Sequence, residues 1–559
     1  MTTNTNVSVH LTPTIRIEQA LEKAGIKDPG YITGLTITGT LTEDDFWFIS
    51  DKMGKTLREL DFSNAEVEDK KITEFTFGLC TGLISITISY TVHSISFRAF
   101  LVCGNLTTIT VHPDNPVYAS ENGLLLNRDK TVLIYCPSGV KGAFVIPEGV
   151  IQIEANTFYD SKRLISILIP KSVIDIGEEP FPNCTSLTCI ATHPENPAFT
   201  SVNGVLFNKD KNELIRYPAM GQGYVTTPNG ECYTVPNNVI KIRKGAFSLC
   251  TNLASIVIPD SVKIIGESAF YDCHGLTSIE IPKSVTEIGE DSFSYCKALT
   301  SIAVHPENSA YTSENGVLFN RDKTGLIRYP AGRRGDCLTG IYPAGRIGNG
   351  LTDIGDCYTV PNTVVKISKG AFSGCENLIS VTIPNSVVTI EERAFESCIS
   401  LTSLKLPDSV KEINDFAFYN CTGLTSMIIP DSVNKIDDFA FMDCKALTDV
   451  ILPLSLVKIN EALFGRTGLT SINVPDSVTE IGEMAFSDCT DLKSVTIPSS
   501  VIKINQYAFW GCTGLSSVNI RGEIVEGSPD DIEKVIDQYI AELDKINEQN
   551  VSKSNEIKS

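Results

Sequence analysis

The chain has 559 residues, of which 42% are hydrophobic and 20% are charged, a composition typical of a folded protein rather than a disordered one. Its formal net charge of -21 disfavours nucleic acid and anionic membranes as partners, and it leaves basic proteins and neutral glycans as candidates. No apolar stretch reaches the roughly 20 residues that cross a bilayer, so we expect no transmembrane segment.

The N-terminal segment, residues 1–56, predicts a cap that contains two helices. One helix is expected from Ile15 to Ala24, where Gly25 ends it, and a second is expected to begin after Thr42 and to run to Met53. The first residues lack the basic and apolar regions of a secretory signal. On that feature alone, the sequence favours a cytoplasmic location.

Prolines recur at a fixed interval of 23 residues through most of the chain. One unit contains Leu276-x-x-Ile279-x-Ile281, which matches the pattern L-x-x-L-x-L of leucine-rich repeats, and its alternation turns Ile279 and Ile281 inward. The fold predicted for residues 57–522 is therefore a leucine-rich-repeat solenoid of stacked short parallel strands. Its convex segments are expected to be irregular or short helices, with helical caps at both ends of the array.

Phenylalanine and cysteine recur at fixed positions of this repeat, which predicts a stacked aromatic spine and a ladder of buried, reduced thiols. The phenylalanines are residues 77, 100, 158, 181, 247, 270, 293, 372, 395, 418, 441, 464, 486 and 509. The ladder cysteines are residues 80, 103, 184, 250, 273, 296, 375, 398, 421, 444, 489 and 512. Five cysteines lie off the ladder, and their pairing stays open: Cys136, Cys189, Cys232, Cys337 and Cys357.

Three hairpins are expected to interrupt the repeats, at about 112–137, 193–218 and 305–330, because each contains two alternating apolar runs around a turn-rich centre. A histidine opens each of them: His112, His193 and His305. Metal or acid/base chemistry would need a second recurrent ligand, so a structural role in a turn is favoured. The tripeptide Arg334-Gly335-Asp336 matches an integrin-recognition signal, although so short a match often arises by chance.

At the C-terminus, residues 523–549 predict an amphipathic helix, because apolar residues from Ile532 to Ile546 form one stripe. Docking on the last repeats is favoured over a partner-binding or oligomerising role. Residues 550–559 are expected to form a flexible tail.

The outward strand positions carry the candidate binding residues. One column is nearly uniform serine, with Asp449 as the exception, and the next column varies from repeat to repeat. Variation on an otherwise fixed skeleton is expected where a ligand is selected, although relaxed constraint on an exposed site predicts the same variation. The candidate binding residues are Lys405, Ile428, Asp449, Ile451 and Asn473. The two isoleucines should prefer a protein surface.

The recurring unit Ile-Pro-x-Ser-Val-x-x-Ile-Gly-x-x-Ala-Phe-x-x-Cys, with the His-Pro-Glu-Asn hairpins, closely resembles BspA-like leucine-rich-repeat proteins from Leu57 to Arg521. The opening residues 32–39 resemble such proteins from gut Bacteroidales. The resemblance implies a surface or secreted protein that binds host matrix proteins, host receptors or other bacteria, without catalysis. It transfers no specific binding residue.

Two functions remain after this reading. The first is a non-catalytic adhesion or binding module, whose partner would be a host matrix or receptor protein or a surface glycan. The alternative is an intracellular protein-interaction scaffold. An enzyme is not expected, because no nucleophile, acid/base pair or metal set converges in the sequence, and the sequence suggests no cofactor or metal.

Overall fold

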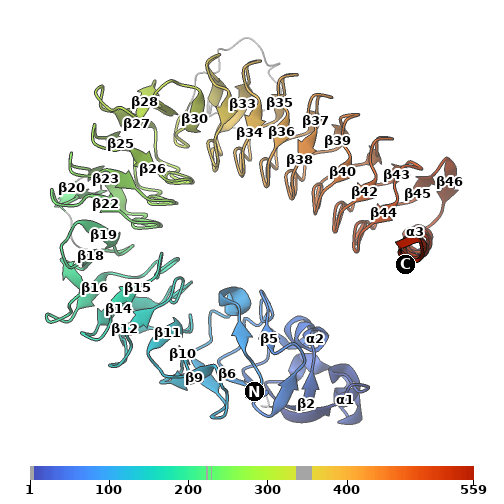
Figure 1. Cartoon of the computed structure of the whole chain (residues 1–559), viewed down its shortest axis with the longest axis horizontal. Helices are drawn as coiled ribbons and strands as arrows, with labels where there is room; N and C mark the ends of the chain where they lie inside the picture. The colour runs from blue at the N-terminus through green and yellow to red at the C-terminus, as the bar shows by residue number, and fades with distance from the viewer. Residues whose placement is uncertain (1–4, 222–224, 228–229, 335–355, 559) are drawn as a thin grey trace, which may run out of the picture. The chain divides into compact units, whose positions relative to one another are not determined.

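The computed structural model describes residues 5–221, 225–227, 230–334 and 356–558. The chain forms two compact units. Unit 1 contains Met1–Leu253 and Ser261–Phe270, and unit 2 contains Ala254–Asp260 and Tyr271–Ser559. In each unit the chain winds in coils that stack one on the next (Figure 1). This confirms the predicted solenoid of short parallel strands.

Unit 1 opens with a parallel sheet that already begins inside residues 1–56. In order, its strands are β1 (Asn6–Leu11), β2 (Gly34–Leu41), β3 (Glu59–Asp61), β6 (Ser85–Ile88) and β8 (Thr108–Val111), and β4 (Ala65–Val67) also pairs with β2. The sequence predicts only helices in this segment, and its two strands, β1 and β2, were not predicted. The signal was present, since Val9 and Leu11 of β1 are buried and alternate with exposed residues.

Both expected N-terminal helices are present as α1 (Ile17–Lys23) and α2 (Glu43–Met53). Thr42 caps α2, because its side chain accepts a hydrogen bond from the N–H of Asp45 while the Asp45 carboxylate accepts from the N–H of Thr42. α1 begins two residues later than expected, since Ile15 pairs with Thr12 in a β-bridge instead.

Unit 2 contains two ladders of parallel strands. The longer strands are β25 (Ser278–Ile281), β27 (Ser301–Val304), β31 (Asp356–Thr359), β33 (Leu378–Thr382), β35 (Ser403–Lys405), β37 (Ser426–Ile428), β39 (Asp449–Ile451), β41 (Ser471–Asn473), β43 (Ser494–Ile497) and β45 (Ser517–Ile520). The second ladder consists of two-residue strands, among them β32 (Lys366–Ile367), β34 (Thr389–Ile390), β36 (Glu412–Ile413) and β38 (Lys435–Ile436). These isoleucines are buried, and the second ladder itself was not predicted from the sequence.

Each interruption is a β-meander of three antiparallel strands rather than the expected two-stranded hairpin, and we keep the name hairpin for it. In unit 2, β28 (Tyr311–Glu314), β29 (Val317–Asn320) and β30 (Gly325–Arg328) pair in sequence. The last strand then pairs in parallel with β32 of the next coil, so the hairpin joins the ladder of short strands. The first strand was missed because Tyr311 to Glu314 are polar or half-buried.

The phenylalanine positions form the predicted stacks within each unit. From Phe372 to Phe509, neighbouring rings lie 4.8 to 5.8 Å apart, with interplanar angles of 4° to 12°. Where a hairpin interrupts the repeat, a tyrosine takes the place of the phenylalanine, as when Tyr329 stacks on Phe372 at 5.3 Å. Offset stacking of these rings stabilises the fold beyond the contribution of their burial.

The ladder cysteines are buried free thiols, as the sequence predicted. They also form weak hydrogen bonds that the sequence did not reveal. The Sγ of Cys421 donates to the carbonyl of Phe395 at 3.1 Å, and Cys444 donates in the same way to Phe418. Burial raises the pKa of the Cys421 thiol to about 12, so this thiol stays protonated and unreactive at neutral pH.

A buried asparagine fixes the start of each hairpin against the preceding coil. Asn308 donates two hydrogen bonds, to the carbonyls of Pro282 and Val285 at 2.8 and 2.9 Å. Its Oδ1 accepts from the N–H groups of Ala310 and Tyr311. Asn115 and Asn196 make the same four contacts in unit 1. The asparagine of the His-Pro-Glu-Asn motif therefore has a structural role.

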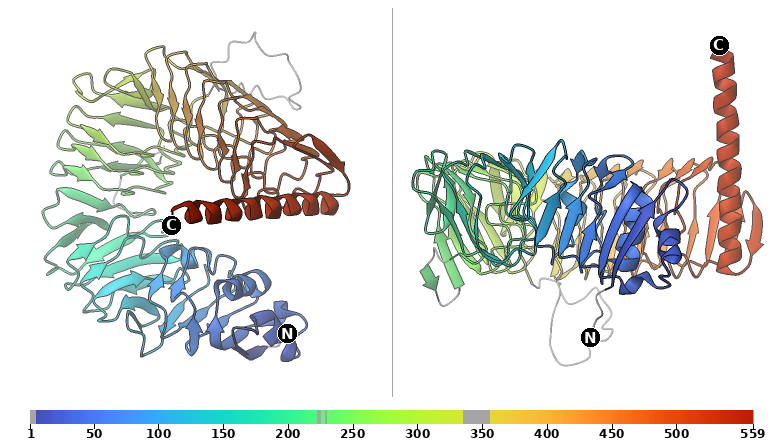
Figure 2. Two further views of the ribbon diagram at one scale, coloured as in Figure 1. Left: turned by 45° about the vertical axis from the view of Figure 1, so that its right-hand side comes forward. Right: turned by 90° about the horizontal axis from the view of Figure 1, so that it is seen from below.

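Unit 2 ends in one long helix, α3 (Pro529–Lys558). Its buried residues Ile532, Ile536, Tyr539 and Leu543 pack against the last coil, and the Tyr539 hydroxyl donates to the carbonyl of Val501 at 3.3 Å. The helix continues to Lys558 instead of ending at residue 549, because no proline or glycine follows Pro529 to stop it. Figure 2 shows its second half running past the edge of the last coil.

Carboxylates also stack along unit 2, on the side of the short strands. The Oδ1 of Asp415 accepts from the N–H of Asp438, and the Oδ1 of Asp438 accepts from the N–H of Glu461, each at 3.0 Å. Partial burial and the neighbouring carboxylates raise the pKa of both Asp415 and Glu461. A raised carboxyl pKa means that ionisation of these groups costs stability in the folded state.

We expect Phe418→Ala to lower the free energy of unfolding by about 3 to 5 kcal/mol, because the ring is fully buried between two stacked neighbours. Urea denaturation followed by circular dichroism measures the loss. Phe416→Ala is the control in the same coil, since that ring is only half-buried, and its loss should be clearly smaller. Equal losses would contradict the aromatic spine as a main source of stability.

We expect Asp438→Asn to stabilise the protein at pH 7 by about 0.5 kcal/mol, because it removes a like charge beside Asp415 and Glu461 and keeps the accepting oxygen. The folded state favours the protonated form of these carboxyls. The stability that this preference adds to the protein is present below their ordinary pKa, and it is lost as the pH rises through their raised folded-state pKa. The gain should therefore vanish near pH 3. Urea midpoints at both pH values test this, with the exposed Asp408→Asn as the matched change of charge.

Candidate functional site

The five candidate binding residues lie on the outward face of β35, β37, β39 and β41, and all five are exposed. Each of these strands is three residues long, with its middle side chain buried and its two outer side chains exposed. The buried middle residues are Leu404, Met427, Val450 and Ile472. The alternation that was read from the sequence therefore places the candidate residues on one surface.

Ile428 and Ile451 are direct partners in the parallel pairing of β37 with β39. Their side chains are 65% and 53% exposed, respectively, so both present most of their apolar surface to solvent. Partner strands lie about 4.8 Å apart, which brings the two side chains into one apolar patch. Asp449 pairs with Ser426 in the same register and sets a carboxylate beside the patch.

Backbone hydrogen bonds hold this surface in place. The N–H of Ile429 donates to the carbonyl of Ile451 at 3.0 Å, and the N–H of Thr448 donates to the carbonyl of Thr425 at 3.0 Å. A partner would meet a surface that is already formed, which lowers the entropic cost of binding.

A further exposed apolar side chain lies close in sequence to Ile451 and was not among the candidate residues. Leu454 is 71% exposed and follows Ile451 by three residues in the same coil. Neighbouring coils carry an aspartate at this position, Asp408 and Asp431, and the N–H of Leu454 donates to the Asp431 carboxylate at 2.7 Å. The replacement of a recurring aspartate by leucine was the signal available in the sequence.

Unit 1 has a second apolar outward column that the sequence analysis did not align. Val145 of β12 (Gly142–Val145), Leu168 of β14 (Leu164–Ile169) and Ala191 of β16 (Cys189–Thr192) are register partners. Val145 and Leu168 are exposed. The 23-residue spacing does not predict this column, because the hairpins interrupt that spacing in this part of the chain.

The three hairpin histidines have the turn role that the sequence favoured. In each, Nδ1 accepts a hydrogen bond at 3.2 Å from the N–H two residues ahead: Asp114 for His112, Glu195 for His193 and Glu307 for His305. Within the described residues, no group of three or more His, Cys, Asp or Glu is arranged to hold a metal ion.

The remaining sequence features do not add to this site. Cys136, Cys189 and Cys232 are free thiols, whereas Cys357 is disulfide-bonded. Cys337 lies outside the described residues, as do Gly335 and Asp336 of the Arg334-Gly335-Asp336 tripeptide. Among the helices that are described, none is long and apolar enough to span a bilayer.

Three solved structures illustrate what the chain resembles. A leucine-rich cell surface protein from Faecalibacterium prausnitzii A2-165 is 27% identical, with a TM-score of 0.34, over 73% of this chain and 96% of that one. A leucine-rich repeat protein from Bacteroides ovatus ATCC 8483 is 24% identical, with a TM-score of 0.28, over 72% and 92%. The pneumococcal vaccine antigen PcpA is 18% identical, with a TM-score of 0.33, over 73% and 86%.

A comparison with curated proteins found no match. The family model described as the BspA type leucine rich repeat region matches residues 54–142, 140–218, 224–324, 356–467 and 412–532, which together cover most of the chain. A Bacteroidales source stays a prediction. The repeats, their hairpins and this match together place the chain in the family of BspA-type leucine-rich-repeat proteins.

Proposed function

We propose that this chain is a non-catalytic adhesion module that binds host or bacterial surface components through the outward face of β35 to β41. The contact residues are Lys405, Ile428, Asp449, Ile451 and Asn473, with Leu454 at the edge. The family and fold are those of repeat proteins that serve as protein-interaction modules. The observation that carries the proposal is the exposed pair Ile428 and Ile451 on a surface whose backbone is fixed.

The chemistry of this face favours a protein partner over a glycan. A partner that covers the two adjacent isoleucines stabilises the complex by about 1.5 to 3 kcal/mol for each side chain that becomes fully buried. Lys405 on one side and Asp449 on the other give the patch a polar rim of both signs. A host matrix or receptor protein with an apolar centre and charged edges matches this arrangement.

The alternative, an intracellular scaffold, draws support from the ladder of free thiols. These thiols are buried, however, and burial raises the pKa of those at Cys375 and Cys421 to about 12. They would therefore remain reduced in an oxidising environment as well.

We expect Ile428→Ser combined with Ile451→Ser to weaken binding at least tenfold, since tenfold corresponds to about 1.4 kcal/mol. The measurement is biolayer interferometry against a panel of purified host matrix proteins, host receptor ectodomains and bacterial surface polysaccharides.

The matched control is Val457→Ser with Ile502→Ser, which removes two exposed apolar side chains next to the short strands β40 (Lys458–Ile459) and β44 (Lys503–Ile504). Its binding should stay within twofold of the unmodified protein. The proposal fails if no panel member binds, or if both double variants lose affinity equally. Binding only to polysaccharide would contradict the protein partner.

A further inference from the structure

The last coil of unit 2 has three backbone N–H groups that lack a hydrogen-bond acceptor, because no further coil follows it. Each preceding coil from Gly370 onward donates three N–H groups, from the turn that carries its spine phenylalanine, to carbonyls of the coil that follows. The penultimate coil does so from Met484 to Gln506, from Phe486 to Ala508 and from Asp488 to Trp510, at 3.2, 2.8 and 2.7 Å. In the final coil the equivalent donors are the N–H groups of Tyr507, Phe509 and Gly511. Within the described residues these three groups form no hydrogen bond.

Helix α3 follows this coil but does not supply the missing acceptors, because its own carbonyls are paired within the helix. It leaves a cavity of about 470 Å³ between its first turns and the turn at residues 506–513. All three unpaired donors belong to residues that line this cavity. The volume is in the range of known ligand sites, about 300 to 1,000 Å³.

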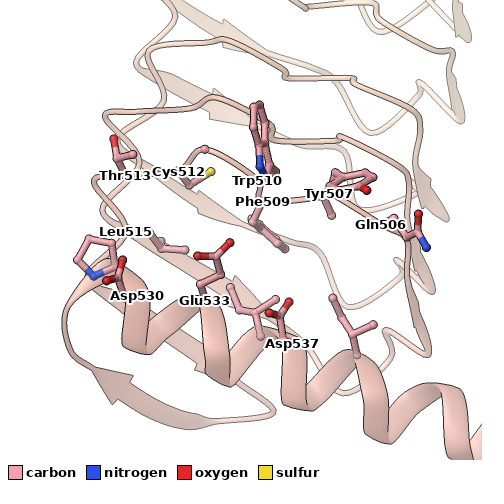
Figure 3. A pocket seen from close by; sticks show the side chains of 15 residues that line it. Gln506, Tyr507, Phe509, Trp510, Cys512, Thr513, Leu515, Asp530, Glu533 and Asp537 are labelled. Carbon is pink, nitrogen blue, oxygen red and sulfur yellow. The ribbon is translucent and has the colours of Figure 1, made fainter. Parts of the chain in front are cut away.

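The two walls of the cavity differ in chemistry. The helix contributes three carboxylates, those of Asp530, Glu533 and Asp537, and Figure 3 shows Glu533 and Asp537 projecting toward the turn. The turn contributes the aromatic rings of Tyr507, Phe509 and Trp510, and Figure 3 shows the Phe509 ring facing Glu533 and Asp537. Within the described residues, none of the three carboxylates is in an ion pair. Carboxylates opposite aromatic rings favour a cation, which gains both ion pairing and cation–π attraction.

The geometry of the turn is fixed before any ligand binds. Tyr507 and Gly511 both have left-handed backbone conformations, with φ of 59° and 75°. A Cβ at Gly511 would lie 2.3 Å from the Oδ1 of Asp488, so a larger residue there would require that carboxylate to move. The carbonyl of Trp510 accepts a hydrogen bond from the N–H of Asp488, and the N–H of Trp510 donates to the carbonyl of Tyr507 at 3.1 Å. The three donors therefore keep the alternating spacing that a further coil would require.

We propose that this cavity binds an extended segment of a partner protein that carries a lysine or arginine. Alternate carbonyls of the segment accept from the N–H groups of Tyr507, Phe509 and Gly511, as the next coil would do. Its basic side chain lies between Phe509 and the carboxylates of Glu533 and Asp537. The inference is independent of the adhesion face on β35 to β41, because the residues of the two sites do not overlap.

A lysine side chain by itself would not use the three backbone donors, and a second copy of this chain would bring a net charge of -21 toward an acidic site. The combination of a strand-like row of donors with an acidic wall thus selects a basic peptide. Both other occupants are outcomes of the test.

The test uses the full chain and a fluorescein-labelled pentapeptide, Thr-Val-Lys-Val-Thr, in fluorescence anisotropy at low salt. We expect saturable binding that weakens at least about tenfold in the variant Glu533→Gln with Asp537→Asn. The control variant, Glu542→Gln with Asp544→Asn, removes the same two charges from exposed positions of the same helix and should change affinity less than about twofold. Hydrogen exchange read by mass spectrometry should show new protection at residues 506–513 when the peptide binds.

Several results would overturn the proposal. The same peptide with glutamate in place of lysine could bind equally well, or both charge variants could lose affinity to the same extent. N-acetyl-lysine amide could bind as tightly as the pentapeptide, with no protection at residues 506–513, which would assign the site to a small cation. Sedimentation equilibrium could reveal a dimer that the Glu533→Gln, Asp537→Asn variant abolishes, which would assign it to a second copy.

Discussion

The structure depends on the hydrogen bonds that each coil makes with the coil that follows. The donors and acceptors sit in the backbone, so their positions must recur at a constant interval whatever side chains are present. In the coil after Phe418, the N–H groups of Phe439 and Phe441 donate to the carbonyls of Glu461 and Leu463, as their counterparts do along the array. Buried phenylalanine and cysteine fill the space that this spacing leaves, and each coil relies on its neighbours for burial.

One coil tests how much variation this constraint tolerates. The spacing from Pro453 to Pro475 is 22 residues, and Thr467 occupies the place of the ladder cysteine. Its hydroxyl donates to the carbonyl of Phe464 at 2.8 Å, so the buried polar group is satisfied. Phe464 and Phe486 still stack, at 5.8 Å. The lost residue is absorbed in the turn between the spine and the next strand.

The same constraint explains where binding chemistry can occur. Inward positions and backbone groups are committed to the stack, so they carry little information about a partner. Freedom remains on the outward strand face, where Ile428 and Ile451 stand at positions that hold Lys405 and Asn473 in the flanking coils, and at the end of the array, where no further coil follows. The face near β37 and the cavity beside α3 are places where the repeat leaves surface unused.

The sequence by itself determined the repeat, the burial of its skeleton and the outward direction of the candidate residues. A 23-residue period with alternating apolar residues has one economical solution, in which equal positions stack. It also determined the turn role of His305 and the reduced state of the ladder, because each follows from a position that recurs.

Only the tertiary structure decided how the irregular parts join the stack. The first strands β1 and β2 lack the repeat signature, and the hairpin strand β28 is half-buried, so their pairing depends on neighbours distant in sequence. The sequence likewise does not reveal the hydrogen bonds by which Asn308 holds the hairpin against the preceding coil. Nor does it reveal the unpaired N–H groups of Tyr507, Phe509 and Gly511. A period reports which residues are equivalent, but whether a backbone group finds a partner depends on what stands next to it in space.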